Sequence, residues 1–155
     1  MLRLTDNGLF PEGVYPCTLD EVQEAFGRFQ GSDRRPRLFQ KLRDYAEAVG
    51  KASFAATLMI DGSFVMSQVD APEDIDIVLI LPADWDLAGE LRPFEYNLVA
   101  KQRVRITYGF DLFVVRSGSE EETIWTEFFQ QISPKWTNAF QLPQGLKKGI
   151  VTLKP

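Results

Sequence analysis

Three aspartates stand in apolar surroundings where a carboxylate is costly unless something neutralises it. Asp74 and Asp76 belong to DIDIVLIL, a segment that predicts a buried strand over Asp74–Leu81. Alternate residues of a strand share a face, so both carboxylates leave the same side. Asp111 lies in YGFDLFVV, which is also β-rich. If the two strands are neighbours, three carboxylates converge, and a divalent cation best relieves their repulsion.

The sequence contains no histidine. Its absence excludes Ser-His-Asp and Cys-His catalysis, and also zinc sites built on imidazole. Carboxylate ligands without imidazole favour a hard ion, Mg²⁺ or Mn²⁺, which keeps some waters and takes further ligands from phosphate. We therefore expect Asp74, Asp76 and Asp111 to be the metal ligands.

A glycine–serine pair follows the strand predicted over Ser53–Asp61. Gly62 allows a sharp turn and a close approach of the backbone to a ligand. Ser63 offers a hydroxyl and a backbone N–H, and N–H groups at the start of a helix can hold phosphate. Gly62 and Ser63 are therefore candidate nucleotide-binding residues.

Taken together, these motifs resemble the polymerase-beta-like nucleotidyltransferase superfamily over about residues 54–115. The shared pattern is Gly-Ser, a gap of ten residues, Asp-x-Asp on a buried strand, and a later strand aspartate. The resemblance implies a minimal nucleotidyltransferase fold with a small mixed β-sheet flanked by helices. It also implies a nucleoside triphosphate substrate, two Mg²⁺ or Mn²⁺ ions, and catalytic roles for Asp74, Asp76 and Asp111.

The sequence pattern GSF…P-x-DIDIVL also resembles that of an uncharacterised bacterial family of short stand-alone members. That family carries an N-terminal PxGxY…TLxE segment, which matches Pro11–Glu21, and a terminal KGI, which matches Lys148–Ile150. Small superfamily members that modify a protein usually carry arginine in the turn. The turn here, Gly62-Ser-Phe-Val-Met-Ser67, has none, so a basic residue from elsewhere must meet the triphosphate charge.

Basic residues occur in two groups. Lys101, Arg103 and Arg105 alternate, so on a strand they would share one face. They are either a phosphate or nucleic-acid contact, with Lys101 and Arg103 as the nucleotide-binding candidates, or cations that protect an exposed edge. A second cluster, at the start of the second helix, is either a solvated face or an RNA or partner contact. It comprises Arg34, Arg35, Arg37, Lys41 and Arg43.

The elements predict an α/β (α+β) fold in a single domain, residues 1–155. We expect an irregular segment 1–16, N-terminal helices within 18–49, a core at about 54–115, a helix 119–131, a loop-like tail 132–144 and a last strand 148–153. Residues 103–108 and 110–115 are expected as a bulged strand or two strands. The last helix should bury Ile124, Trp125, Phe128, Phe129 and Ile132. Trp136 either packs against the tail or contacts a nucleotide or partner.

Composition narrows the setting. The net charge of −5 does not draw the chain to nucleic acid. One cysteine, Cys17, permits no internal disulfide and fits the cytoplasm. No stretch has the length or apolarity of a membrane span, and we expect no membrane partner.

The predicted function is metal-dependent transfer of a nucleoside monophosphate to a hydroxyl acceptor. A protein partner is the expected acceptor, and the resemblance implies a possible toxin–antitoxin or phage-defence pair. An RNA-end (tRNA) nucleotidyltransferase and an inactive interaction or antitoxin module with the same fold remain the alternatives. An oligomer is compatible with all three.

Overall fold

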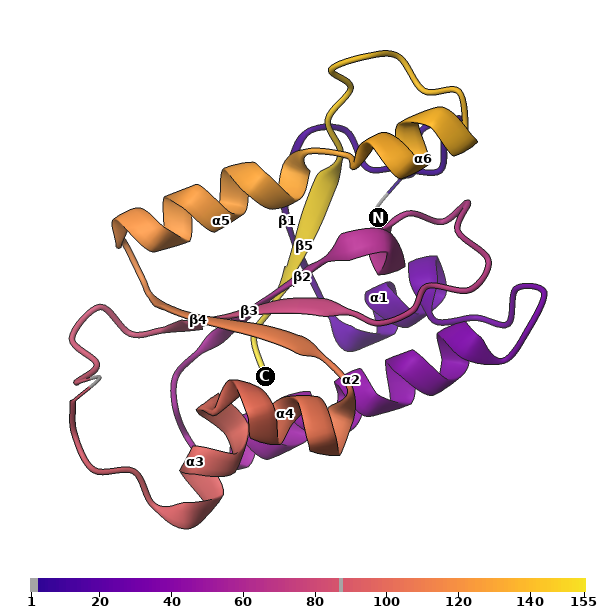
Figure 1. Cartoon of the computed structure of the whole chain (residues 1–155). Coiled ribbons are helices and arrows are strands. Elements are labelled where there is room, and N and C mark those ends of the chain that lie inside the picture. Colours follow the sequence, from indigo (N-terminus) through magenta and orange to yellow (C-terminus); the bar gives the residue numbers. More distant parts are fainter. Residues whose placement is uncertain (1–2, 87) are drawn as a thin grey trace.

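The computed structural model describes residues 3–86 and 88–155. Within this range five strands form one mixed sheet with the order β1-β5-β2-β3-β4 (Figure 1). β1 pairs with β5 and β3 with β4 in parallel, whereas β2 runs antiparallel to both β3 and β5. The strands are β1 Gly13–Cys17, β2 Thr57–Asp61, β3 Asp76–Leu81, β4 Asp111–Arg116 and β5 Gly149–Leu153. The predicted mixed α/β fold is confirmed.

Helices cover both faces of the sheet. One face packs on α1 Leu19–Phe26, α2 Arg34–Lys51, α3 Pro93–Val99 and α4 Lys101–Tyr108, and the other on α5 Glu120–Gln130 (Figure 1). A short 3₁₀ turn, η1 Gly62–Val65, follows β2, and α6 Pro134–Ala139 packs near it. None of the helices within the described ranges is long and apolar enough to cross a membrane.

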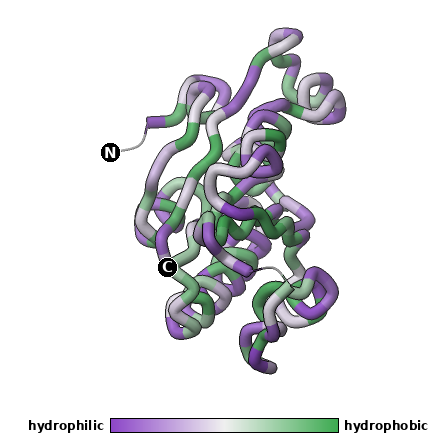
Figure 2. Tube along the Cα trace, turned by 90° about the vertical axis from the view of Figure 1, so that its left-hand side faces the viewer, coloured by the Kyte–Doolittle hydropathy of each residue, from purple (hydrophilic) through white to green (hydrophobic). Residues whose placement is uncertain are grey.

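The core lies on the two sides of β3. Ile77 and Leu79 face the large cluster under α1 and α2, and Val78 faces the smaller cluster under α5, all without solvent exposure. β3 is thus a central strand, as its continuous apolar run predicts. Hydrophobic segments run through the interior, and hydrophilic segments lie mainly on the outside (Figure 2).

Local signals located several elements well. Thr18 caps α1 by accepting from the Glu21 N–H at 3.1 Å, while the Glu21 carboxylate accepts from the Thr18 N–H at 3.1 Å, which is the predicted capping box. β2, β3 and β5 lie within their predicted strands, although α2 continues one residue past Gly50. Residues 1 and 2, which belong to the predicted irregular segment 1–16, and residue 87, within the predicted core, lie outside the described residues.

The strand predicted over residues 103–108 was wrong, because these residues form α4. Gly109 ends the helix in the left-handed conformation (φ 80°), with its N–H bonded to the carbonyls of Val104 and Arg105. Val104 is the buried residue of this helix, which packs on the outside of the core. Its β-branched composition indicated a strand, but packing against the sheet overrode that preference.

Three further expectations were wrong. The segment 1–16 includes most of β1, which pairs with β5 from the other end of the chain, and the tail 132–144 includes α6. Of the α5 residues expected in the core, Phe129 is buried, but Ile124 and Phe128 are 53% and 54% exposed. The sheet covers a narrower stripe of this helix than its apolar residues occupy.

Candidate functional site

Three neighbouring strands each bring an aspartate to the same end of the sheet. Asp61 of β2 lies opposite Asp76 of β3, and Asp76 lies beside Asp111 of β4. Residues in register on adjacent strands project to the same face. That face is the one covered by α5, because Met59, Val78 and Phe113, two residues along each strand, pack in the α5 cluster.

The structure brings together the three aspartates expected as metal ligands. One carboxylate oxygen each from Asp74, Asp76 and Asp111 lies within 4.8 Å of the others. All three residues are partly exposed, so the cluster is open to solvent on one side. Three oxygen donors with an open side fit Mg²⁺ or Mn²⁺, which retain waters and accept phosphate oxygens.

The carboxyl group of Asp76 is the most perturbed of the three. Burial and, to a smaller extent, the charges of Asp74 and Asp111 raise its pKa to about 6, against the opposing effect of Lys148 and Arg105. The folded chain therefore holds negative charge here at a cost. A bound cation would remove that cost, which agrees with the donor set.

A guanidinium partly neutralises the cluster. Nη1 of Arg105 lies 2.9 Å from Oδ2 of Asp74 and 3.2 Å from Oδ1 of Asp111, and it also donates to the Gly109 carbonyl at 3.2 Å. The Arg105 side chain is 54% exposed, so it can leave without disturbing the core. The guanidinium therefore lies where a divalent cation would also attract the carboxylates of Asp74 and Asp111.

The two predicted nucleotide contacts on α4 are not on one face with each other. Residues two apart on a helix are about 200° apart around its axis, whereas residues four apart lie one turn above each other. Lys101 is thus aligned with Arg105, and its Nζ lies 4.7 Å from the centre of the Phe113 ring. Arg103 is exposed on the other side of the helix, away from the aspartates. The single-face stripe was a consequence of the wrong strand prediction.

Gly62 is required by the geometry of the site. Its φ of 83° is a conformation that side chains disfavour, and a Cβ at this position would collide with the carboxylate of Asp76. Ser63 is the second residue of the 3₁₀ turn that Gly62 begins, and both residues line a pocket with Asp76. The backbone at Gly62 therefore approaches the Asp76 carboxylate so closely that no side chain fits between them.

The side chain of Arg35 stabilises this turn through hydrogen bonds to backbone carbonyl groups. The residue is 1% exposed, and its guanidinium donates to the carbonyls of Phe64, Met66 and Val69 at 2.7 to 3.1 Å, and to Phe26 at 3.0 Å. The expectation that it belongs to a solvated or RNA-binding cluster was therefore wrong. Burial lowers the pKa of Arg35 to about 10, so it remains charged.

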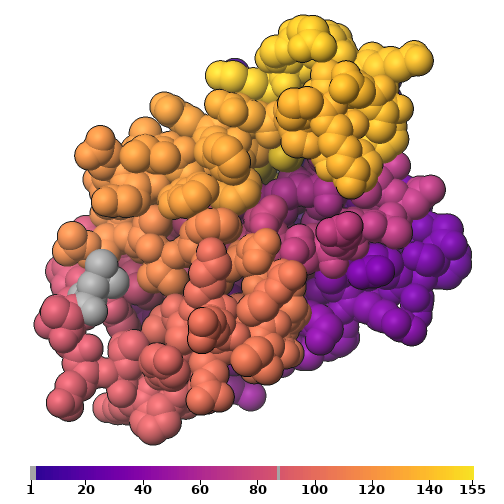
Figure 3. All heavy atoms as spheres, in the orientation of Figure 1, coloured from indigo at the N-terminus to yellow at the C-terminus, as the bar shows by residue number. Residues whose placement is uncertain are grey.

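The pocket beside the aspartates has a volume of about 430 Å³. Gly62, Ser63 and Asp76 form one wall, and the end of α5 with the start of α6, including Trp136, forms the other. In Figure 3 the magenta segment after β2 lies deeper than the orange and yellow segments that border it. Trp136 also stacks on Phe140 at 5.7 Å, so it both packs against the tail and lines the pocket.

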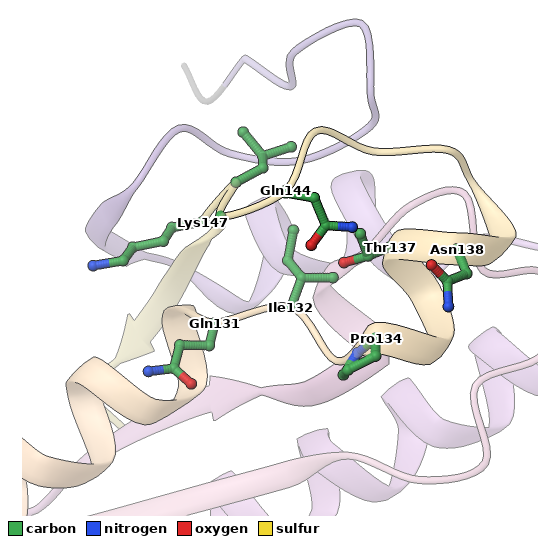
Figure 4. A pocket seen from close by; sticks show the side chains of 9 residues that line it. Gln131, Ile132, Pro134, Thr137, Asn138, Gln144 and Lys147 are labelled. Carbon is green, nitrogen blue, oxygen red and sulfur yellow. The ribbon is translucent and has the colours of Figure 1, made fainter.

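A second hollow of about 350 Å³ lies behind the connection between α5 and α6. Gln131, Ile132 and Pro134 line both hollows. Figure 4 shows its other side chains, which come from α6 and the loop before β5 and are mostly uncharged, such as Thr137 and Gln144. It contains none of the aspartates and is not part of the acidic site.

Sequence reasoning missed two site residues, Asp61 and Lys148. Asp61 is fully buried, and burial raises its pKa well above the ordinary value. Lys148 is 4% exposed and lines the pocket; burial lowers its pKa, while Asp61 and Asp76 act in the opposite direction. The available signals were an aspartate ending an apolar strand before Gly62 and the terminal KGI segment. Neither signal reveals that β5 lies beside β2.

Fold and site define a mixed α/β protein with an acidic cluster beside a glycine–serine turn. The model of a protein family described as "Family of unknown function (DUF6932)" matches residues 2–154, and the chain belongs to that family. Comparisons with curated proteins and with solved structures found no match.

Proposed function

We propose that this protein is a metal-dependent nucleotidyltransferase that moves a nucleoside monophosphate from a nucleoside triphosphate to a hydroxyl acceptor. The observation that carries the proposal is the convergence of Asp74, Asp76 and Asp111 within 4.8 Å beside the Gly62 turn. Clustered carboxylates without histidine suit phosphoryl chemistry, in which positioning and charge neutralisation lower most of the barrier.

Mg²⁺ or Mn²⁺ ions held by these aspartates would neutralise phosphate charge and make the acceptor hydroxyl more acidic. The chain itself would orient the substrate. Gly62 and Ser63 would face the phosphate chain, and the open side of the cluster would admit the acceptor. Asp111, 42% exposed, is the aspartate best placed to accept the hydroxyl proton.

In the proposed reaction the acceptor oxygen forms a bond to the α-phosphorus. The bond between the α-phosphorus and the oxygen bridging to the β-phosphate breaks, and pyrophosphate leaves with that electron pair. The acceptor proton passes to Asp111 and then to water. The products are a nucleotidylated acceptor, pyrophosphate and one proton.

A protein is the acceptor that the surface favours. Ile124 and Phe128 are more than half exposed on α5, and Phe128 also lines the pocket. Exposed apolar side chains beside a site are typical of protein contacts, and the net charge of −5 opposes RNA binding. A cytoplasmic location and a role in a toxin–antitoxin or defence pair stay predictions.

The test is transfer of label from each of the four α-³²P nucleoside triphosphates, with Mg²⁺ or Mn²⁺ and cell extract. Wild type should label a protein band, and Asp76→Asn should lower labelling at least about a hundredfold because a ligand of the reacting centre is lost. Asp84→Asn, an exposed aspartate after β3, is the matched control and should behave as wild type.

The outcomes separate the candidate functions. Label in an RNA band that requires Asp76 would identify an RNA-end transferase. Equal labelling by wild type and Asp76→Asn would exclude this site as the active centre. No label with any nucleotide and either metal would contradict transfer and favour a non-catalytic interaction module.

A further inference from the structure

Lys148 is a buried cation that the acidic cluster alone does not explain. It precedes β5, is 4% exposed, and lines the pocket with Gly62, Ser63 and Asp76. Within the described residues its Nζ has one hydrogen-bond acceptor, the Gln131 carbonyl at 3.5 Å, and no carboxylate within 4.0 Å. An ammonium group has three protons to donate, so it retains capacity for a ligand.

Asp61 is a second buried ionisable group, and it interacts electrostatically with Lys148. Its carboxylate is fully buried, and among the described residues neither oxygen has a hydrogen-bond partner. Lys148 and Asp76 are the charged groups that act on it. A buried carboxylate without hydrogen bonds is costly unless a cation lies near. Lys148 favours the ionised form of Asp61, whereas burial, the larger effect, raises the pKa of this carboxyl group.

The neighbouring lysine shows the contrast. Lys147 is 53% exposed and pairs with Glu12 at 3.3 Å on the surface. Lys148, one residue further, is turned inward, where its N–H bonds to the Gln130 carbonyl and its side chain reaches the pocket. The ammonium group of Lys148 therefore has donor capacity that the described residues do not use, and the pocket that it lines is open.

We propose that Lys148 binds the β- and γ-phosphates of the nucleoside triphosphate, with Asp61 as the buried acidic group that interacts with it from the sheet. This proposal rests on the proposed function. The turn at Gly62 carries no arginine, and among the described residues that line this pocket Lys148 is the one with a cationic side chain. Lys148 also neutralises the pyrophosphate as it leaves, whichever base the nucleotide carries.

Calorimetric titration with inorganic tripolyphosphate and Mg²⁺ tests this without knowledge of the base. Lys148→Gln should weaken tripolyphosphate binding about tenfold or more, because a charge-assisted contact is lost. Binding of Mn²⁺ alone, followed by electron paramagnetic resonance, should change less than about threefold. Lys147→Gln is the matched control and should bind both probes as wild type does.

A second variant guards against loss of folding. Lys148→Gln leaves Asp61 buried without a cation, so the double variant Asp61→Asn/Lys148→Gln removes both charges and keeps both shapes. It should melt near the wild-type temperature and still bind tripolyphosphate about tenfold more weakly. Restored binding in the double variant would overturn the proposal, because the loss in the single variant would then come from the orphaned aspartate.

The two proposals fail separately. Unchanged tripolyphosphate binding in Lys148→Gln, or no binding by a wild type that still binds Mn²⁺, would overturn the role of Lys148 whatever the labelling shows. If the labelling experiment finds no transfer but tripolyphosphate binding depends on Lys148, the phosphate site stands in a protein that binds nucleotide without transferring it.

Discussion

Arg105 and the three aspartates form one cluster, in which a single positive charge meets three carboxyl groups. The guanidinium bridges Asp74 and Asp111 at about the place where a divalent cation would act. Two cations cannot share these oxygens without repulsion, so Arg105 must move aside or turn toward phosphate when metal binds. The residue has the exposure that such a movement needs.

At this scale we expect Arg105→Gln to strengthen Mn²⁺ binding several-fold in the absence of nucleotide, because the competing charge is removed. Isothermal titration with Mn²⁺ measures it. Arg103→Gln, an equally exposed change on the other side of the same helix, should leave the affinity within about twofold. Weaker Mn²⁺ binding by Arg105→Gln would mean that the arginine organises the carboxylates and does not compete for them.

The elements that matter most for the site are the β2–η1 turn and the start of α2 beneath it. Arg35 donates to the carbonyls that follow this turn and leaves none of its own N–H groups to solvent. Helix α2 therefore holds the Gly62 turn through one side chain. The conformation of the turn therefore depends on the Arg35 side chain as well as on Gly62.

Replacement of Arg35 should strongly lower the free energy of unfolding. Arg35→Met leaves several buried carbonyls without donors, and we expect it to lower the free energy of unfolding by about 3 kcal/mol or more. Arg37→Met, which loses an exposed i,i+4 ion pair with Asp33, should cost less than about 0.5 kcal/mol. Urea denaturation of both variants gives the comparison; similar values would refute the buried role of Arg35.

For the whole molecule, the acidic site makes stability depend on pH. Burial raises the pKa of Asp76 to about 6 from an ordinary 3.8, and the pKa of Asp61 moves in the same direction. A raised carboxyl pKa means that the folded chain binds the proton more tightly than the unfolded chain. This contribution is complete below about pH 4 and is lost as pH rises through about 6.

Asp76→Asn should therefore stabilise the metal-free protein at pH 7 by about 1 kcal/mol and have little effect at pH 4. Thermal melts of both proteins at the two pH values measure this difference in stability. The other titratable groups are the same in both proteins, so their contributions cancel in the comparison. Saturating Mg²⁺ at pH 7 should narrow the gap by stabilising the wild type. A variant that melts lower than wild type at pH 7 would mean that the charge of Asp76 stabilises the folded chain, the opposite of this expectation.

Prediction from sequence succeeded where the signal was local. The capping box at Thr18 and the apolar run of β3 depend on neighbours in the chain, and both were located correctly. It failed at β1, whose partner β5 comes from the opposite end of the chain, and at α4, whose β-branched residues pack as a helix. In the α5 helix, apolar composition could not reveal that Phe128 remains exposed.

The sequence alone determined the chemistry that is open to this protein. Without histidine, and with Asp74 and Asp76 two residues apart at the start of an apolar run, carboxylates were the available metal ligands, because residue spacing is a local property. The tertiary structure alone decided that Asp61, Lys148 and Arg105 join them. Each of these residues reaches the site through strand pairing or helix packing between distant segments, and the energy of such contacts is set by burial that no short stretch of sequence encodes.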